Sequence, residues 1–251
     1  MTERGVLDSH YLTENQAEQL YTLGDAAHDF DHVQRVAHLA VQIAQAEGAD
    51  VEVVLLAALL HDVPHELAFE TSVVARQSHH LAAAEFARHY LTAQEMASNR
   101  VENVVHCIEA HRFRDQSVQP ATLEAQCLYD ADKLDSIGAI GIARAFAFAG
   151  THGNRLWTEP WPAAPQPEAK PSGADYTPVH EFVYKLRRIL ATLHTPTAQA
   201  IGAQRHSFME NFYEQLDAEM RQVYQQSGVQ SQQPRTKRDR FSSGLWTPDC
   251  C

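Results

Sequence analysis

Apolar residues return along this chain every three or four positions, which is the spacing of one face of an α-helix. The segment 29–47 shows the pattern most clearly, with apolar residues at Val33, Val36, Ala37, Ala40, Ile43 and Ala44. Val51–Leu60 is instead almost unbroken Val, Leu and Ala, which is typical of a buried helix, and Asp50 is its candidate cap. No stretch shows the convincing period-2 alternation of a strand. The pattern therefore predicts an all-α protein.

Further helices are expected at residues 14–23, 79–91, 93–111, 123–149, 179–193 and 196–226, with either a short helix or a loop at 64–78. Gly138 and Gly141 fall inside the helix expected at 123–149, where each weakens the helix by about 1 kcal/mol relative to alanine. Their i, i+3 spacing suggests a close helix crossing as the compensating gain.

The expected elements form one domain, at residues 25–227, preceded by an N-terminal helix within residues 1–24 that packs on its core. Inside the domain, residues 151–175 form a Pro-rich loop, which is predicted to be mobile or to act as a partial lid because long loops in compact domains are usually functional. Residues 228–251 are rich in Ser, Gln and basic side chains and are expected to be a disordered tail.

Composition and charge narrow the range of partners. The 251 residues carry a formal charge of −12, which argues against nucleic acid, since that partner usually requires a basic surface. No run is apolar over the roughly 18 residues that span a membrane, and the N-terminus shows no secretory signal, so we expect a cytoplasmic protein without membrane contact. The four cysteines lack zinc-ribbon or disulfide spacing, and the two internal ones are expected to be core residues.

The candidate chemistry centres on the pair His61-Asp62, which ends the buried apolar helix. Two polar groups left unpaired in such a place are costly, and a divalent cation would remove that cost. The alternative is a capped helix end at which the ring nitrogens of the histidine are hydrogen-bonded within the protein. His32 and Asp132 offer the same ligand types from two other expected helices, whereas Asp130 should point away from Asp132.

Three segments carry a resemblance to a known family: HVQRV at 32–36, AALLHD at 57–62 and DADKLDSIGAIGIAR at 130–144. With them the chain resembles the HD-domain metal-dependent phosphohydrolase superfamily, a helical bundle with its metal site between helices. The last segment, together with Lys185-Leu186 and residues 195–209, is similar to a bacterial branch of nucleotide-hydrolysing HD proteins. The similarity covers roughly residues 20–225.

The resemblance implies four metal ligands, His32, His61, Asp62 and Asp132. Mn²⁺ or Mg²⁺ is the expected ion, and Ni²⁺, Co²⁺ or Zn²⁺ could also bind. The implied reaction is attack of metal-activated water on phosphorus, with (deoxy)nucleoside triphosphates favoured as substrates. We expect a small-molecule nucleotide or phosphate ester as the partner and allow for a homodimer.

Catalytic roles beyond the ligands remain open at this point. His65 stands where many HD proteins carry an acid, so the general base is open: His65 or Glu66 could serve, or metal-bound hydroxide could suffice. Asp135 is the third catalytic candidate and is expected to orient a metal ligand or an arginine. Lys133 is expected to face solvent.

Substrate contacts are expected from two groups of residues. Arg35 and Arg144 are candidate phosphate clamps, and the alternative for each is a salt bridge to an internal Asp. Among the remaining histidines, His111 with His79 or His80 is expected to contact phosphate or a second ion. The alternative for these three is an imidazole at the surface or at a helix end.

Two other functions compete with triphosphate hydrolysis. One is a 5'-nucleotidase or other phosphomonoesterase. The other is a non-catalytic, helical ligand-sensing protein that retains the site for a structural metal.

Overall fold

The computed structural model describes residues 7–21, 30–64, 79–112, 118–158 and 173–227. They belong to two compact units, residues 1–211 and 212–251, and the boundary falls within the last helix. The α-helices are α1 (Glu14–Tyr21), α2 (Phe30–Glu47), α3 (Val51–Leu60), α5 (His79–Ala93), α6 (Ser98–Ala110), α7 (Leu123–Asp135), α8 (Gly138–Thr151), α9 (Pro178–Tyr184) and α10 (Pro196–Ser227). Two 3₁₀ segments are η3 (Gly173–Asp175) and η4 (Leu186–Thr192). The described ranges contain no strand, and the expected all-α class is confirmed.

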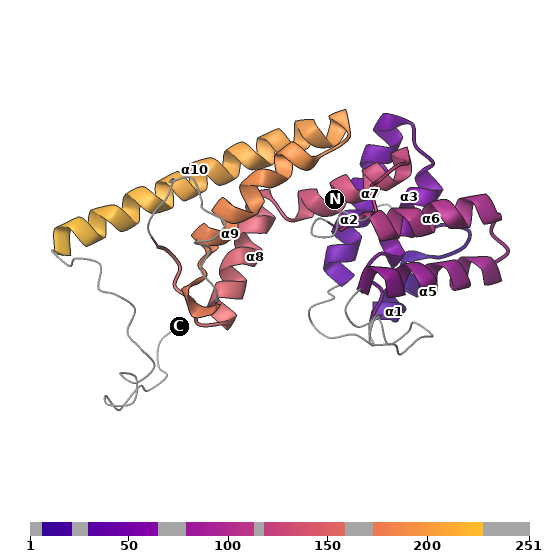
Figure 1. Cartoon of the computed structure of the whole chain (residues 1–251), viewed down its shortest axis with the longest axis horizontal. Coiled ribbons are helices and arrows are strands. Elements are labelled where there is room, and N and C mark those ends of the chain that lie inside the picture. Colours follow the sequence, from indigo (N-terminus) through magenta and orange to yellow (C-terminus); the bar gives the residue numbers. More distant parts are fainter. Residues whose placement is uncertain (1–6, 22–29, 65–78, 113–117, 159–172, 228–251) are drawn as a thin grey trace, which may run out of the picture. The chain divides into compact units, whose positions relative to one another are not determined.

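Helix α3 lies at the centre of the first unit, packed against α2, α6 and α7 (Figure 1). Every residue from Val53 to Leu60 is buried, which explains why this helix is apolar on all faces. Asp50 caps it as expected, with a side chain that accepts hydrogen bonds from the backbone N–H groups of Glu52 and Val53. The buried helix therefore delivers its C-terminal end, and His61 after it, into the interior.

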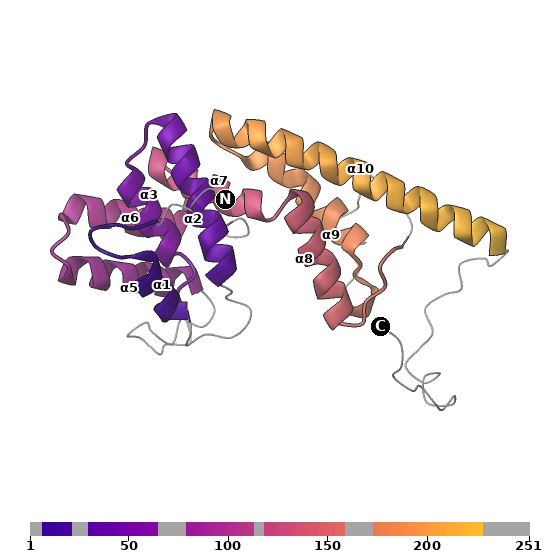
Figure 2. The ribbon, with the colours of Figure 1, turned by 180° about the vertical axis from the view of Figure 1, so that it is seen from behind.

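Helix α1 contacts α3 and carries the side chain that holds this end of it (Figure 2 shows α1 from behind). The hydroxyl of buried Tyr21 donates to the carbonyl of Leu59 at 3.0 Å. A carbonyl in the last turn of a helix has no partner within the helix, so this bond satisfies a buried acceptor. It lies two residues before His61 and holds the backbone there.

The prediction of one long helix at 123–149 is wrong, because α7 ends at Asp135 and α8 starts at Gly138. Gly138 has a φ of +77°, which side-chain-bearing residues rarely adopt, and a Cβ there would lie 3.0 Å from Cγ of Arg205 on α10. A Cβ on Gly141 would lie 2.2 Å from the carbonyl oxygen of Ser136. The glycines thus permit a sharp break between two helices, and the close approach to α10 occurs at this break.

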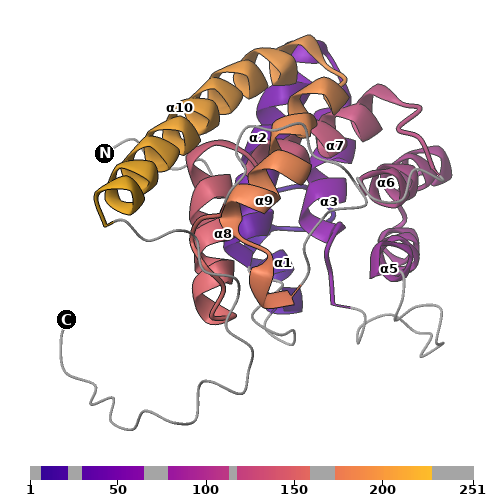
Figure 3. The ribbon, with the colours of Figure 1, turned by 60° about the vertical axis from the view of Figure 1, so that its left-hand side comes forward.

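Two other boundaries differ from the expectation. Helix α6 begins at Ser98, after a turn in which Glu95 has a φ of 58°. The helix expected at 179–193 is divided at Lys185, whose φ of −131° ends α9 before η4 begins. The break at Lys185 lies inside the apolar pattern of one expected helix, and the local backbone geometry overrides that pattern. Helix α9 lies beside α8 (Figure 3).

Some expectations concern regions that the structure tests only in part. Residues 159–172 of the Pro-rich segment and the tail at 228–251 lie outside the described residues. Within the described ranges, no helix combines the length and apolarity that crossing a bilayer requires. Cys107 and Cys127 are buried and free, as expected of core residues.

Asp130 ties α7 to the start of α10. Its fully buried carboxylate accepts hydrogen bonds from the backbone N–H of His194 at 2.9 Å and from both N–H and Oγ1 of Thr195 at 2.7 Å. The expected orientation away from Asp132 is confirmed, and the reason is that Asp130 serves the fold.

Replacing Asp130 with alanine should destabilise the protein by about 3 kcal/mol, because it leaves buried N–H donors unpaired. Asp50→Ala is the matched control: this partly exposed helix cap should cost about 1 kcal/mol. Urea unfolding of both variants measures the difference. Equal losses would mean that the bonds of Asp130 do not anchor α10.

Candidate metal centre

Four elements bring ligand-type side chains to one point inside the bundle: α2, α3, α6 and α7. His32 comes from α2, His61 follows the last residue of α3, and Asp132 comes from α7. His61 is shared by two groups whose ligand atoms lie within 4.8 Å of one another, His32–His61–Asp132 and His61–Asp62–His111. The structure therefore brings together all four residues that the resemblance implied as ligands.

The spacing between these atoms suits a shared ion better than pairwise hydrogen bonds. Nε2 of His32 lies 3.5 Å from Oδ1 of Asp132 and 3.9 Å from Oδ2 of Asp62. Nε2 of His61 lies 3.6 Å from the same Asp62 oxygen. Such distances are at or beyond the limit of a hydrogen bond. Ligand atoms about 2 Å from one ion lie roughly 3 Å apart at octahedral angles, which is close to what is observed.

His61 gives the most direct indication that a cation belongs here. Its Nδ1 lies 2.8 Å from the carbonyl oxygen of Ala58, so this nitrogen carries the proton and donates it. In the neutral ring Nε2 then carries a lone pair. The side chain is fully buried, and Nε2 has no hydrogen-bond partner. A buried acceptor without a partner is costly, and a divalent metal would remove that cost.

His32 is held by the carboxylate of Asp135, which is itself fully buried. Its Nδ1 lies 2.7 Å from Oδ2 of Asp135, an arrangement that leaves Nε2 directed at the centre. Burial by itself would lower the pKa of His32, but hydrogen bonds and charge from Asp132 and Asp135 outweigh it and raise the pKa to about 9. The ring is therefore protonated at neutral pH while these carboxylates face it.

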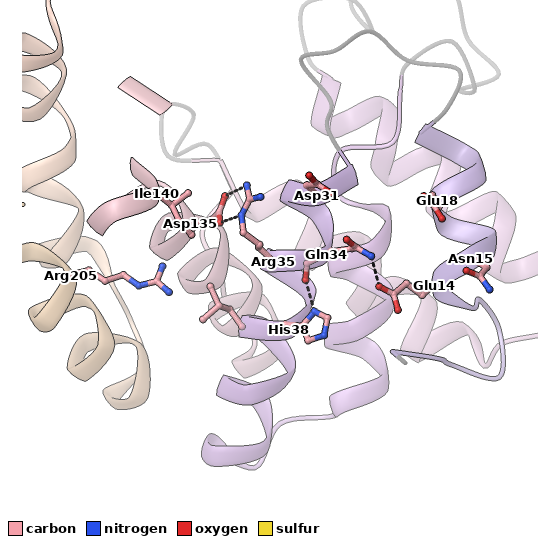
Figure 4. A pocket seen from close by; sticks show the side chains of 11 residues that line it. Glu14, Asn15, Glu18, Asp31, Gln34, Arg35, His38, Asp135, Ile140 and Arg205 are labelled. Atoms are coloured by element: carbon pink, nitrogen blue, oxygen red, sulfur yellow. Dashed lines mark hydrogen bonds and ion pairs between the residues drawn. The ribbon is translucent and has the colours of Figure 1, made fainter. Parts of the chain in front are cut away.

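Arg35 and Arg144 both bind Asp135. Nε and Nη2 of Arg35 donate to its two oxygens at 2.7 and 3.1 Å, and Nη1 of Arg144 donates at 3.2 Å (Figure 4 shows the Arg35 pair). This is the alternative that the sequence left open for both arginines, a salt bridge to an internal Asp. Burial would raise the pKa of the Asp135 carboxyl, but the hydrogen bonds from His32 and Arg35 lower it to about 2.

The expectation that Lys133 faces solvent is wrong. Its ammonium is buried, pairs with Asp132 Oδ2 and lies 5.2 Å from the centre of the Tyr129 ring. The ring face of Tyr129, one helical turn earlier, supports the cation and was the sequence signal for this position. Lys133 occupies one oxygen of Asp132 and leaves Oδ1 facing His32.

The other predicted residues divide between described and undescribed positions. His111 lies at the centre, with its ring 5.2 Å from that of His61 and its Nδ1 2.6 Å from the Ile108 carbonyl oxygen. Burial lowers the pKa of His111 to about 4, so this ring is neutral. The His80 ring lies 6.3 Å from that of His111. His65 and Glu66 lie outside the described residues, as does the side chain of His79.

Comparisons of sequence and of structure with known proteins lead to the same family. The HD-domain family model matches residues 29–137, a range that includes all four candidate ligands. YpgQ of Bacillus subtilis (strain 168), an uncharacterized protein, is 34% identical over 220 residues, covering 82% of this chain and 94% of YpgQ. The chain belongs to the HD-domain family.

Solved structures of family members agree with this assignment. The crystal structure of B. subtilis YpgQ in complex with ADP matches with a TM-score of 0.58 and 31% identity, over 82% of this chain and 95% of that one. A predicted HD-superfamily hydrolase from an uncultured Thermotogales bacterium matches with a TM-score of 0.54 and 28% identity, over 82% and 90% of the two chains. The expected family is confirmed, and the second of these neighbours is described as a predicted HD-superfamily hydrolase.

Asp135→Asn should weaken metal binding by roughly 10–100-fold, because the partner that orients and polarises His32 is lost while all four ligands remain. Arg144→Ala is the control, since it removes another partner of Asp135 and leaves the carboxylate in place. Metal titration by calorimetry measures both. Unchanged affinity in Asp135→Asn would show that this contact does not support the metal.

The raised pKa of His32 predicts that a metal must displace a proton to bind. Below about pH 9 the metal-free ring is protonated, so binding should release about one proton at pH 7–8, and affinity should rise up to tenfold per pH unit before levelling above pH 9. Calorimetry in buffers of different ionisation enthalpy counts the protons released. No release at pH 7.5 would contradict the assigned contacts of His32.

Proposed function

We propose that this HD-family protein is a divalent-metal-dependent phosphohydrolase of nucleotides, with (deoxy)nucleoside triphosphates as preferred substrates. His32, His61, Asp62 and Asp132 would hold the ion, Mn²⁺ or Mg²⁺ by preference. The single observation that supports this best is the buried, unpartnered Nε2 of His61 beside two carboxylates. ADP in the crystal structure of YpgQ supports a nucleotide as the ligand class.

The charges around the centre favour an anionic substrate. Asp62 and Asp132 balance a divalent ion, and the histidine ligands would be neutral when bound. Three cations adjoin the centre: Arg35, Lys133 and Arg144. Asp135 holds Arg35 and Arg144, and Asp132 holds Lys133, so a divalent ion would leave the loaded site with excess positive charge toward a phosphate. A divalent ion there supplies Lewis-acid chemistry, acidifying water and neutralising phosphate charge.

Asp62 marks the side from which the substrate approaches. Its side chain is 34% exposed, whereas those of His32, Asp132 and His61 are 15%, 14% and 0% exposed. We assign His65 and Glu66 as candidate general bases because they follow Asp62 within four residues of the chain. His80 and His111 are assigned to contact phosphate or a second ion.

Asp62→Ala should remove a ligand and reduce hydrolysis to background while the helical core survives. Glu52→Ala is the matched control, because the Glu52 side chain is 32% exposed and pairs with Arg100 away from the centre. Metal content, far-ultraviolet circular dichroism and phosphate release should be measured on both. Full activity in metal-free Asp62→Ala protein would overturn the catalytic proposal.

A phosphate-release screen with Mn²⁺ separates the competing functions. Triphosphate hydrolysis with pyrophosphate or phosphate as product supports the proposal, and preference for monophosphates supports the 5'-nucleotidase alternative. Stoichiometric metal without hydrolysis of any phosphate ester would favour the non-catalytic sensor.

A further inference from the structure

A cavity of about 280 Å³ lies beside the metal centre, where the ends of α6 and η4 meet α7. Arg112, Tyr129 and His194 line it with two rings and a guanidinium. The rings of Tyr129 and His194 meet edge to face, with 5.0 Å between centroids. None of these three residues is a candidate metal ligand.

The cavity and the metal centre share two elements, α7 and the end of α6. On α7, Asp132 faces the centre and Tyr129 lines the cavity, and Lys133 joins them by contacting both. At the end of α6, His111 lies at the centre and the next residue, Arg112, lines the cavity. A ligand whose phosphates reach the metal could therefore extend past Lys133 into the cavity.

We propose that this cavity binds the nucleobase of a nucleotide whose phosphates lie at the metal centre. The inference rests on the proposed function and adds the position of the nucleoside. Bases stack on aromatic side chains and on guanidinium planes, and the cavity offers both kinds of surface. Gln119 adds an amide at the rim, a group that can both donate to and accept from a base edge.

The volume of the cavity suits one part of a nucleotide, not the whole molecule. Pockets for whole drug-sized ligands measure about 300–1,000 Å³, so a cavity of about 280 Å³ suits one ring system. The phosphates would remain outside it, next to the ammonium of Lys133. This division matches the chemistry of the two places, rings in the cavity and cations at the centre.

A larger cavity, about 670 Å³, lies on the other side of Asp135 and is less suited to a nucleotide (Figure 4). Arg35 and Arg205 line it, but so do four carboxylates, from Glu14, Glu18, Asp31 and Asp135. The Arg35 guanidinium already binds Asp135 through two nitrogens. The acidic lining would repel phosphate, whereas the described residues that line the smaller cavity include no carboxylate.

Binding of two matched probes tests the proposal without turnover. The α,β-methylene analogue of ADP carries a base, and methylenediphosphonate has the same bridged diphosphonate unit without a nucleoside. With Mn²⁺ present, His194→Ala should raise the Kd of the nucleotide analogue about tenfold by removing one stacking surface, and should leave methylenediphosphonate unchanged. His194 is exposed, so its loss should not unfold the protein.

Two further variants serve as controls. His194→Phe should keep nucleotide affinity, because it retains a ring without the imidazole. His38→Ala removes another exposed histidine, which lines the larger cavity, and should alter neither Kd.

Wild-type affinity in His194→Ala, equal weakening of both probes, or a wild-type protein that binds the two probes equally would each overturn the subsite. Phosphate release is scored separately. Absence of nucleotide hydrolysis would count against the proposed function, and the probe affinities would still decide where the base binds.

Discussion

The metal centre depends on His61, a buried imidazole in which only one ring nitrogen has a hydrogen-bond partner in the protein. Helix α3 is apolar on every face, so it lies inside the bundle and brings His61 with it. The carbonyl of Ala58 takes the Nδ1 proton, and Nε2 remains unpartnered among carboxylates from other elements. Everything around it orients a ligand: Asp135 holds His32, Lys133 holds Asp132, and Tyr21 fixes the backbone before His61. A divalent cation is the species that such an arrangement accommodates.

The apolar pattern was sufficient for the all-α class, and the resemblance to the HD-domain superfamily supplied the set His32, His61, Asp62 and Asp132, which the structure brings together. Helix boundaries were harder. The break before Gly138 depends on a positive φ and on contact with Arg205, which is distant in sequence. Apolar periodicity continues through that break and could not reveal it.

Side-chain partners were least predictable. Lys133 adjoins Asp132 in sequence, and its burial depends on the face of Tyr129. Arg35 and Arg144 were open between phosphate and an internal carboxylate, and the structure places both on Asp135. The choice made by each arginine depends on distances between helices, which no spacing rule within one helix supplies. The same applies to the cavity that Arg112, Tyr129 and His194 line from three segments.

Anomalous diffraction from crystals grown with Mn²⁺ tests the central claim most directly. The account predicts one strong peak about 2 Å from Nε2 of His32, Nε2 of His61 and a carboxylate oxygen each of Asp62 and Asp132. A protein saturated with Mn²⁺ that shows no peak among these four residues, or shows one elsewhere, would contradict it.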